Sequence, residues 1–367
     1  MKPQLFSNVP LRIILIVPFV LQIFSAVGLV GYLSFRTGQK AVNDLAVQLQ
    51  NEISSRVQQK LDTYLEIPPL INQINSNAFT AGLLTIDNPT EIEEFFYKQV
   101  KLFDSVSYVF IGNTKGGIIA PGRRLDDVSV MEKTDKFDDF IAGEDYKVYA
   151  LDDKGRQGEL LELYSDYDVR TRPWYTAAVE AGEPIWHKAY SFFGRPDVLS
   201  LPHAQPLYDE NNNLLGVLAT EIVLTEISDF LKTLDVGSTG EVFIIEQSGL
   251  MIATSTEQKL TFLDEERQEA IRLQVAESET PLIRTSAEHL AEKFSSLEDI
   301  SDRQLLEFNL NGERHFLHIL PFKKDAGIDW LIVTIVPESD FMAQMNANTQ
   351  TTIFLCLGTL ALATIFG

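Results

Sequence analysis

Cysteine is almost absent from this sequence. The chain of 367 residues has a single cysteine, Cys356, which excludes an intramolecular disulfide and a zinc site built from several thiolates. Basic residues are also few, because 30 Lys and Arg stand against 52 Asp and Glu and give a net charge of −22. Nucleic-acid binding needs clustered Lys and Arg, so we expect no nucleic-acid partner. A hydrophobic content of 45% excludes intrinsic disorder.

Catalytic motifs are missing as well. The sequence has no G-x-S-x-G, no H-E-x-x-H, no Walker loop and no G-x-G-x-x-G. His315 and His318 lie in a predicted strand, where a separation of three places them on opposite faces. Acidic pairs such as Asp126-Asp127 and Asp152-Asp153 are typical of solvated turns. We therefore expect no catalytic residue, metal site or cofactor.

One long hydrophobic run lies near the N-terminus. Residues 13–35 contain no charge and are bounded by Arg12 and Arg36, and about 20 apolar residues span a bilayer core. The alternative, a cleavable signal peptide, has a shorter apolar region and a small-x-small cleavage site, whereas this run continues past Ser25-Ala26. We expect an uncleaved transmembrane helix, with residues 1–12 in the cytoplasm.

A second hydrophobic run closes the sequence. Residues 353–367 are apolar, and we interpret 341–367 as an exit helix that leads into a truncated second transmembrane helix. The first 36 residues carry three positive charges and no acid, so residues 37–340 carry −25. Lys2 and Arg12 place the N-terminus weakly on the cytoplasmic side by the positive-inside rule. The acidic middle of the chain would then lie outside, anchored to the inner membrane.

A helical stripe follows the first hydrophobic run. Apolar residues from Val42 to Leu65 recur at spacings of three or four, which predicts a helix with one apolar face. We expect Pro68-Pro69 to kink or end it. Residues 37–90 form this predicted region, either as a dimer stalk that transmits motion or as a helix that packs on a core.

The rest of the chain has the short period of β-strands. Hairpins are predicted around 106–120 and 146–155, strands at 184–192, 198–207 and 214–223, and a helix capped by Thr225. A second set begins at 240, with helices at 264–277 and 281–294 and a hairpin turn at Asn311-Gly312. Residues 218–231 and 331–342 both run an apolar strand into a Ser-Asp-Phe helix start. This weak repeat predicts two similar α/β modules at 91–234 and 235–340.

One cluster of residues has the chemistry of a binding site. The stretch from Tyr167 to Tyr175 combines Arg172 with Trp174 and two tyrosines at the edge of a predicted helix. A guanidinium binds a carboxylate through two parallel hydrogen bonds, and indole and phenol groups add oriented donors. The alternative is that Arg172 pairs with a nearby acid while Trp174 and Tyr175 fill the core.

The pattern Y-x4-R-x-W-Y, followed by a strand tyrosine and by an acid at the end of Gly216–Glu221, resembles the double Cache domain of bacterial transmembrane receptors. The resemblance covers about residues 37–345. It implies an α/β (α+β) fold with a long N-terminal stalk helix, two PAS-like antiparallel-sheet modules and flanking transmembrane helices. It also implies that Tyr167, Arg172 and Trp174 of the membrane-distal module hold a ligand carboxylate, and that three further residues face its ammonium group, Tyr175, Tyr190 and Glu221.

Two positions depart from the amino-acid-binding pattern of that family. Glu221 stands where the pattern has Asp, and Phe192 stands where a second acid often follows. An ammonium group would then meet one longer acid instead of two shorter ones. The alternatives to an α-amino acid therefore stay open: a larger amine, a simple carboxylate or no ligand.

The resemblance implies the ligand-sensing region of a membrane receptor with a histidine kinase or nucleotide cyclase output. We expect a small carboxylate-bearing ligand, an amino acid first, and a homodimer formed through the stalk helix. The competing hypothesis is a membrane-anchored binding or dimerisation module without a small-molecule ligand. An ectoenzyme is not favoured by any motif in the sequence.

Overall fold

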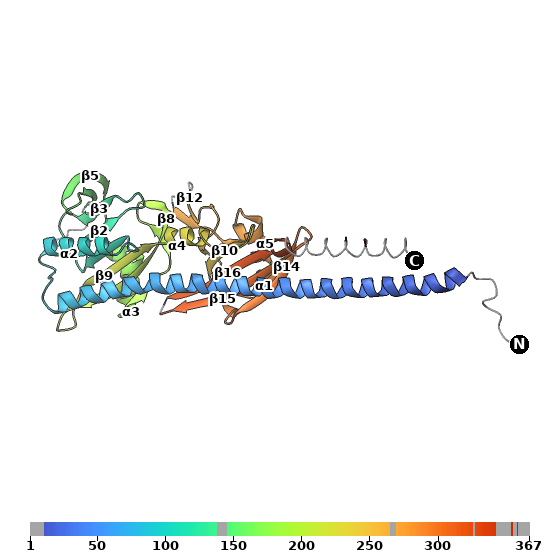
Figure 1. Cartoon of the computed structure of the whole chain (residues 1–367). Helices are drawn as coiled ribbons and strands as arrows, with labels where there is room; N and C mark the ends of the chain where they lie inside the picture. Colours follow the sequence, from blue (N-terminus) through green and yellow to red (C-terminus); the bar gives the residue numbers. More distant parts are fainter. Residues whose placement is uncertain are drawn as a thin grey trace.

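A long helix runs beside two β-sheets that follow each other along it (Figure 1). The computed structural model describes residues 11–137, 145–264, 269–325, 327–342, 354 and 358. Within them, a long N-terminal helix precedes antiparallel sheets, so the predicted mixed α and β fold is confirmed.

The long helix, α1 (Leu11–Thr80), is continuous through Pro68 and Pro69. The predicted kink or end at these prolines is therefore wrong. Each proline removes one backbone hydrogen bond from the helix. Tertiary packing on both sides offsets this cost, because Leu65 before the prolines and Ile71 after them are fully buried.

Buried polar side chains attach α1 to both sheets. Gln50 Nε2 donates to the Phe316 carbonyl at 2.9 Å, and Ser54 Oγ lies 2.8 Å from His318 Nδ1. Farther along the helix, Asn72 Nδ2 donates to the His203 carbonyl at 2.8 Å and Nδ1 at 2.9 Å, while the Thr220 hydroxyl donates to Asn72 Oδ1 at 2.7 Å. Because polar groups without partners are costly inside a protein, these bonds fix where α1 lies on the sheets.

Asn72→Ala is expected to lower the free energy of unfolding by about 2–4 kcal/mol, because it leaves buried His203 and Thr220 groups without partners. Asn77→Ala is the matched control, since exposed Asn77 on the same helix bonds only to Gln73 through its side chain. Urea denaturation of both variants measures the difference. Equal stability of the two variants would contradict the role given to Asn72.

The larger sheet has nine strands and lies beside the C-terminal part of α1. Its order is β5-β4-β3-β2-β1-β9-β8-β6, with β7 paired to β8, and all pairs are antiparallel. The strands are β1 (Tyr108–Asn113), β2 (Ile118–Arg123), β3 (Ser129–Thr134), β4 (Tyr146–Leu151), β5 (Gln157–Tyr164), β6 (Ile185–Trp186), β7 (Tyr190–Phe192), β8 (Arg195–Tyr208) and β9 (Leu214–Val223).

Both faces of this sheet are covered at its centre, which is why β1 is buried along its whole length. Val109 and Ile111 pack with residues of α1 and α2 (Pro89–Leu102). The alternate residues, Tyr108 and Phe110, point to the opposite face, where a short 3-10 helix, η1 (Val169–Thr171), leads into α3 (Pro173–Ala181).

The smaller sheet repeats the central order of the larger one. Its order is β11-β10-β16-β15-β14, which corresponds to β2-β1-β9-β8-β6. In each sheet the last strand lies between the first strand and the penultimate long strand. The bounds are β10 (Glu241–Glu246), β11 (Met251–Thr254), β14 (Gln304–Leu310), β15 (Glu313–Lys324) and β16 (Ile328–Pro337), with α5 (Pro281–Lys293) and the 3-10 helix η3 (Leu297–Asp299) alongside.

Three local predictions are wrong. Residues 264–277 hold β12 (Thr261–Asp264), β13 (Glu269–Arg272) and η2 (Val275–Glu277) instead of one helix. Their charged composition favours a helix, but backbone hydrogen bonds to distant residues favour strands instead. The Leu273 N–H donates to the Leu260 carbonyl, and the Leu273 carbonyl accepts from the Met251 N–H. The strand predicted at 184–192 is split into β6 and β7. Helix α4 (Thr225–Lys232) has Leu224 at its N-cap, so Thr225 is not the cap.

A hydrophobic core joins the two sheets and α1. It includes Leu61 and Tyr64 of α1, Trp186 and Leu201 of the larger sheet, and Trp330 of the smaller sheet. The two sheets are therefore not independent of each other or of the helix.

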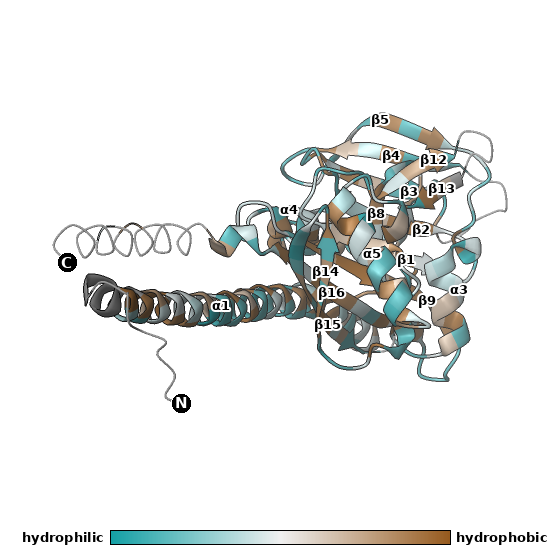
Figure 2. Cartoon of the chain, turned by 90° about the vertical axis from the view of Figure 1, so that its right-hand side faces the viewer, coloured by the Kyte–Doolittle hydropathy of each residue, from teal (hydrophilic) through white to brown (hydrophobic). Residues whose placement is uncertain are grey.

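The N-terminal part of α1 extends beyond the sheets and is rich in hydrophobic residues (Figure 2). From Val17 this helix is long and apolar enough to cross a membrane, by length and composition alone. Phe19, Leu21, Phe24 and Phe35 are all more than half exposed. At the other end the chain turns into a helix at Ser339, and nearly all of the predicted second span lies outside the described residues.

Candidate ligand-binding site

A cavity lies on the α3 side of the larger sheet. The space between its lining atoms is about 340 Å³, part of which is open to solvent. It is lined by β1, β2, β3, β4, β7, β9, the segment before α3 and the start of α3. Eight of its thirteen lining residues are aromatic, so a ligand there would contact a mostly apolar wall.

The segment that leads into α3 is shaped by its own sequence. Asp168 caps η1, and its carboxylate accepts a hydrogen bond from the Arg170 amide at 2.9 Å. Pro173 occupies the first turn of α3 and keeps Arg172 before it in an extended conformation. Gly112 lies beneath this segment, where a Cβ atom would be 2.7 Å from Val169 and 3.2 Å from Trp174. The segment can therefore pack directly on β1.

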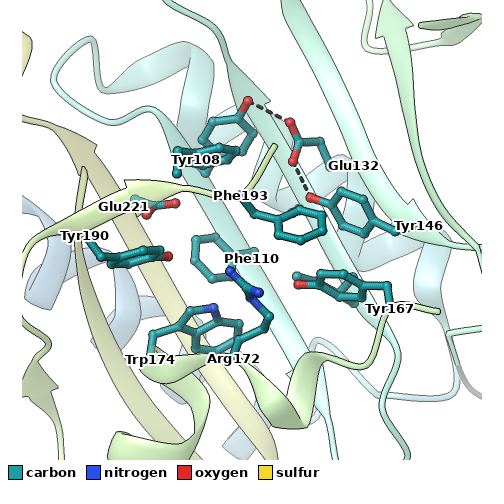
Figure 3. Close-up of a pocket in the computed structure, with 13 residues that line it drawn as sticks. Tyr108, Phe110, Glu132, Tyr146, Tyr167, Arg172, Trp174, Tyr190, Phe193 and Glu221 are labelled. Atoms are coloured by element: carbon teal, nitrogen blue, oxygen red, sulfur yellow. Dashed lines mark hydrogen bonds between the residues drawn. The ribbon is translucent and has the colours of Figure 1, made fainter. Parts of the chain in front are cut away.

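Arg172 is half-buried and points into the cavity between the rings of Phe110 and Phe193 (Figure 3). Its guanidinium carbon lies 4.6 Å from the centre of the Phe193 ring. Within the described ranges it makes no ion pair, whereas Arg170 two residues earlier is bound to Asp168 at 2.6 Å. The alternative in which Arg172 pairs with a nearby acid is therefore not what the structure shows.

Four further predicted residues line the same cavity. Figure 3 shows the Trp174 indole nitrogen and the Tyr167 and Tyr190 hydroxyls turned toward its centre, with the Glu221 carboxylate beside Tyr190. These groups come from η1–α3, β7 and β9, and the fold brings them together. Tyr175 is not among the lining residues, because it lies behind Trp174 and its hydroxyl donates to the Asn113 carbonyl at 3.3 Å.

Glu221 is only 2% exposed. Its Oε1 accepts a hydrogen bond from the Ser200 hydroxyl at 2.6 Å. Burial raises the pKa of Glu221 to about 7, against the opposing effect of hydrogen bonds from Ser200 and Tyr190. Within the described part of the chain it has no ion pair, so the charged form has no cationic partner of its own.

The cavity contains a second carboxylate, Glu132 on β3, which the sequence analysis did not identify. Its Oε1 accepts hydrogen bonds from Tyr108 Oη at 2.8 Å and Arg195 Nη2 at 3.2 Å, and its Oε2 accepts one from Tyr146 Oη. Burial raises the pKa of Glu132, and Arg195 acts in the opposite direction. No local motif marks this residue, because β3 was not predicted as a strand.

The comparisons agree with this fold. The family model for the Cache domain, dCache_1, matches residues 37–345, and the chain belongs to this family. The domain is a sensor domain and not an enzyme.

Two curated relatives are methyl-accepting chemotaxis proteins. PctB of Pseudomonas aeruginosa is 23% identical over 210 residues, which is 56% of this chain and 28% of that protein. McpA of Pseudomonas putida is 29% identical over 94 residues, which is 25% of this chain and 14% of that protein. The chain therefore aligns with less than a third of either relative.

The chain is also similar to solved structures, one of which supports the fold. Methyl-accepting chemotaxis protein X has a TM-score of 0.50 and 13% identity, with 82% of this chain and 98% of that chain covered. The ligand-binding domain of the amino acid chemoreceptor PctB of Pseudomonas aeruginosa PAO1, in complex with L-Arg, has a TM-score of 0.48 and 18% identity, with 82% and 98% covered.

Proposed function

We propose that this chain is the extracytoplasmic ligand-sensing region of a bacterial membrane receptor, and that its cavity binds a small α-amino acid. The observation that carries the proposal is Arg172, a cation without an ion pair in the described structure, which points into a mostly aromatic cavity. A ligand carboxylate supplies the partner that this guanidinium lacks, with the Trp174 N–H and the Tyr167 hydroxyl as further donors.

We expect Glu221 to bind the ammonium group of the ligand, at the opposite end from the carboxylate. It is buried and has no cationic partner among the described residues, while Tyr190 and Ser200 hold its position. A zwitterion would match one cation and one anion of the cavity at the same time. The ligand-binding domain of PctB has been solved in complex with L-Arg and with L-Gln.

The membrane and the partner are part of the same proposal. The exposed apolar part of α1 would anchor the chain in the inner membrane, with the sheets outside. We also propose a homodimer through α1, whose outward residues Leu45 and Leu70 are each 50% exposed. A chain that stays monomeric in detergent at high concentration would contradict the dimer.

The output of the receptor is a separate question. A histidine kinase or cyclase output was expected from the family resemblance, but both curated relatives are methyl-accepting chemotaxis proteins. We propose a signal-transduction receptor, and sequencing the reading frame around this segment tests whether it encodes an output domain.

A thermal-shift screen of the full 367-residue chain in detergent tests the ligand. Amino acids, amines and simple carboxylates are compared, and a true ligand raises the unfolding temperature increasingly with its concentration. We expect shifts with amino acids. Shifts with simple carboxylates alone would remove the ammonium part of the proposal, and no shift with any compound would favour the interaction module without a ligand.

A further inference from the structure

The end of the cavity away from Trp174 is closed by a network that balances its own charge. Figure 3 shows Glu132 there, with the Tyr108 and Tyr146 hydroxyls reaching it. Both oxygens of Glu132 accept hydrogen bonds from protein groups, and its side chain is 3% exposed. The carboxylate is therefore already supplied with donors before a ligand enters.

The positive charge that balances Glu132 comes from Arg195 on β8. Its Nη2 lies 3.2 Å from Glu132 Oε1 and donates to Tyr108 Oη at 2.6 Å. Its guanidinium carbon lies 4.1 Å from the centre of the Phe192 ring. Phe192 lines the cavity and Arg195 does not, so the arginine lies behind the aromatic wall.

We propose that the Glu132–Arg195 pair sets the side-chain specificity of the site, so that it accepts α-amino acids with uncharged, apolar side chains and rejects acidic and basic ones. This inference rests on the proposed function. Arg172 and Glu221 match the two charges of the ligand backbone, and Glu132 and Arg195 match each other. Among the described residues that line this end, no charge is then left for a charged ligand side chain.

The aromatic wall strengthens the argument. A ligand side chain at this end would meet Tyr146, Phe192 and Phe193, with Ile118 and Ala120 nearby in the lining. A charged group there would lose its water without gaining a partner, which costs free energy. An apolar group gains free energy from leaving water at the same place.

The test is calorimetric titration of the full-length chain in detergent with L-leucine, L-phenylalanine, L-lysine and L-glutamate. We expect wild type to bind leucine or phenylalanine more than about tenfold more tightly than either charged amino acid. Arg195→Met removes the cation that pairs with Glu132, so a lysine ammonium can take its place, and lysine binding should improve relative to leucine. Glu132→Gln leaves Arg195 unbalanced and should improve glutamate binding instead.

The double variant Glu132→Gln/Arg195→Met is the matched control. It removes both charges, so it should keep the wild-type preference for apolar side chains. Thermal unfolding identifies any single variant that does not fold. In that case the inference is tested by the order of affinities for the four amino acids in the wild type and in the double variant. Binding of lysine or glutamate within tenfold of the best apolar ligand in wild type overturns the inference, as does an unchanged ranking in folded single variants.

The specificity inference and the proposed function are contradicted by different results. If amino acids bind and Arg172→Ala abolishes binding, but the single variants leave the ranking unchanged, only the specificity inference is wrong. If no amino acid binds, or binding does not depend on Arg172, the proposed function is wrong and the inference falls with it.

Discussion

Replacing Arg172 by alanine is expected to weaken binding of the carboxylate ligand by on the order of 100-fold or more, because one or two charge-assisted hydrogen bonds are lost at about 1.5–3 kcal/mol each. Stability should change little. Arg172 makes no ion pair within the described residues, and its contact with the Phe193 ring is worth about 0.5–1 kcal/mol at a partly exposed site. Titration calorimetry and thermal unfolding of the full-length variant measure the two effects separately.

Arg170→Ala is the matched control for this variant. Arg170 belongs to the same short segment, and its substitution removes a side chain of the same size. The Arg170 guanidinium is bound to Asp168 and does not line the cavity. The cap on η1 remains, because Asp168 still accepts from the backbone amide of residue 170. Equal loss of affinity in both variants would mean that the segment is merely distorted and that Arg172 does not contact the ligand.

The second large effect is a pH dependence caused by Glu221. Its pKa is about 7 in the folded protein against an ordinary value of 4.5, so the unfolded chain releases this proton at lower pH. The free energy of unfolding is then unaffected below pH 4.5 and falls as the pH rises through 7. The full loss is about 3 kcal/mol, from about 1.4 kcal/mol for each pH unit between the two values.

Glu221→Gln isolates this contribution, because Glu132 and the other titrating groups are present in both proteins. Relative to wild type, the variant should gain up to about 3 kcal/mol of stability between pH 5 and pH 8. Chemical denaturation at the two pH values measures the gain. A difference between the two proteins that does not change with pH would show that Glu221 titrates normally.

The pH dependence of ligand affinity differs between amino acids and simple carboxylates. An ammonium group beside Glu221 favours the carboxylate form, so an amino acid should bind more tightly as the pH rises from 6 to 8. A simple carboxylate would be repelled by the same charge and should bind more weakly over that range. Titrations of both ligand classes at the two pH values therefore separate a zwitterion site from a carboxylate site.

Part of the candidate site is marked by local signals in the sequence. Tyr167, Arg172 and Trp174 lie within eight positions of each other around a proline that starts a helix. Tyr190 and Glu221 come from separate strands, and the family resemblance rather than spacing pointed to them. Several strands were also predictable, among them β1, β8 and β9 of the larger sheet, since their alternation and turn residues are local properties.

The missed features depend on contacts distant in sequence. Glu132 lies in the cavity only because β3 pairs with β2 and β4, which places it beside Tyr108 and Tyr146. The continuity of α1 through Pro68 depends on burial against both sheets, and the strands in 261–272 depend on pairing with each other. Such contacts have no signature in the local composition.

Because α1 is one continuous helix, it connects both sheets to its hydrophobic N-terminal end. Ser54 ties the helix to the smaller sheet and Asn72 ties it to the larger one, and at 1.5 Å per residue these points are about 27 Å apart. From Ser54 to Leu11 the same helix extends about 65 Å. With Ser54 as the fulcrum, a sideways shift of about 1 Å at Asn72 moves the N-terminal end by about 2.4 Å in the opposite direction. If the larger sheet shifted relative to its neighbour, a rigid α1 pivoting at Ser54 would amplify and reverse that displacement at its hydrophobic end.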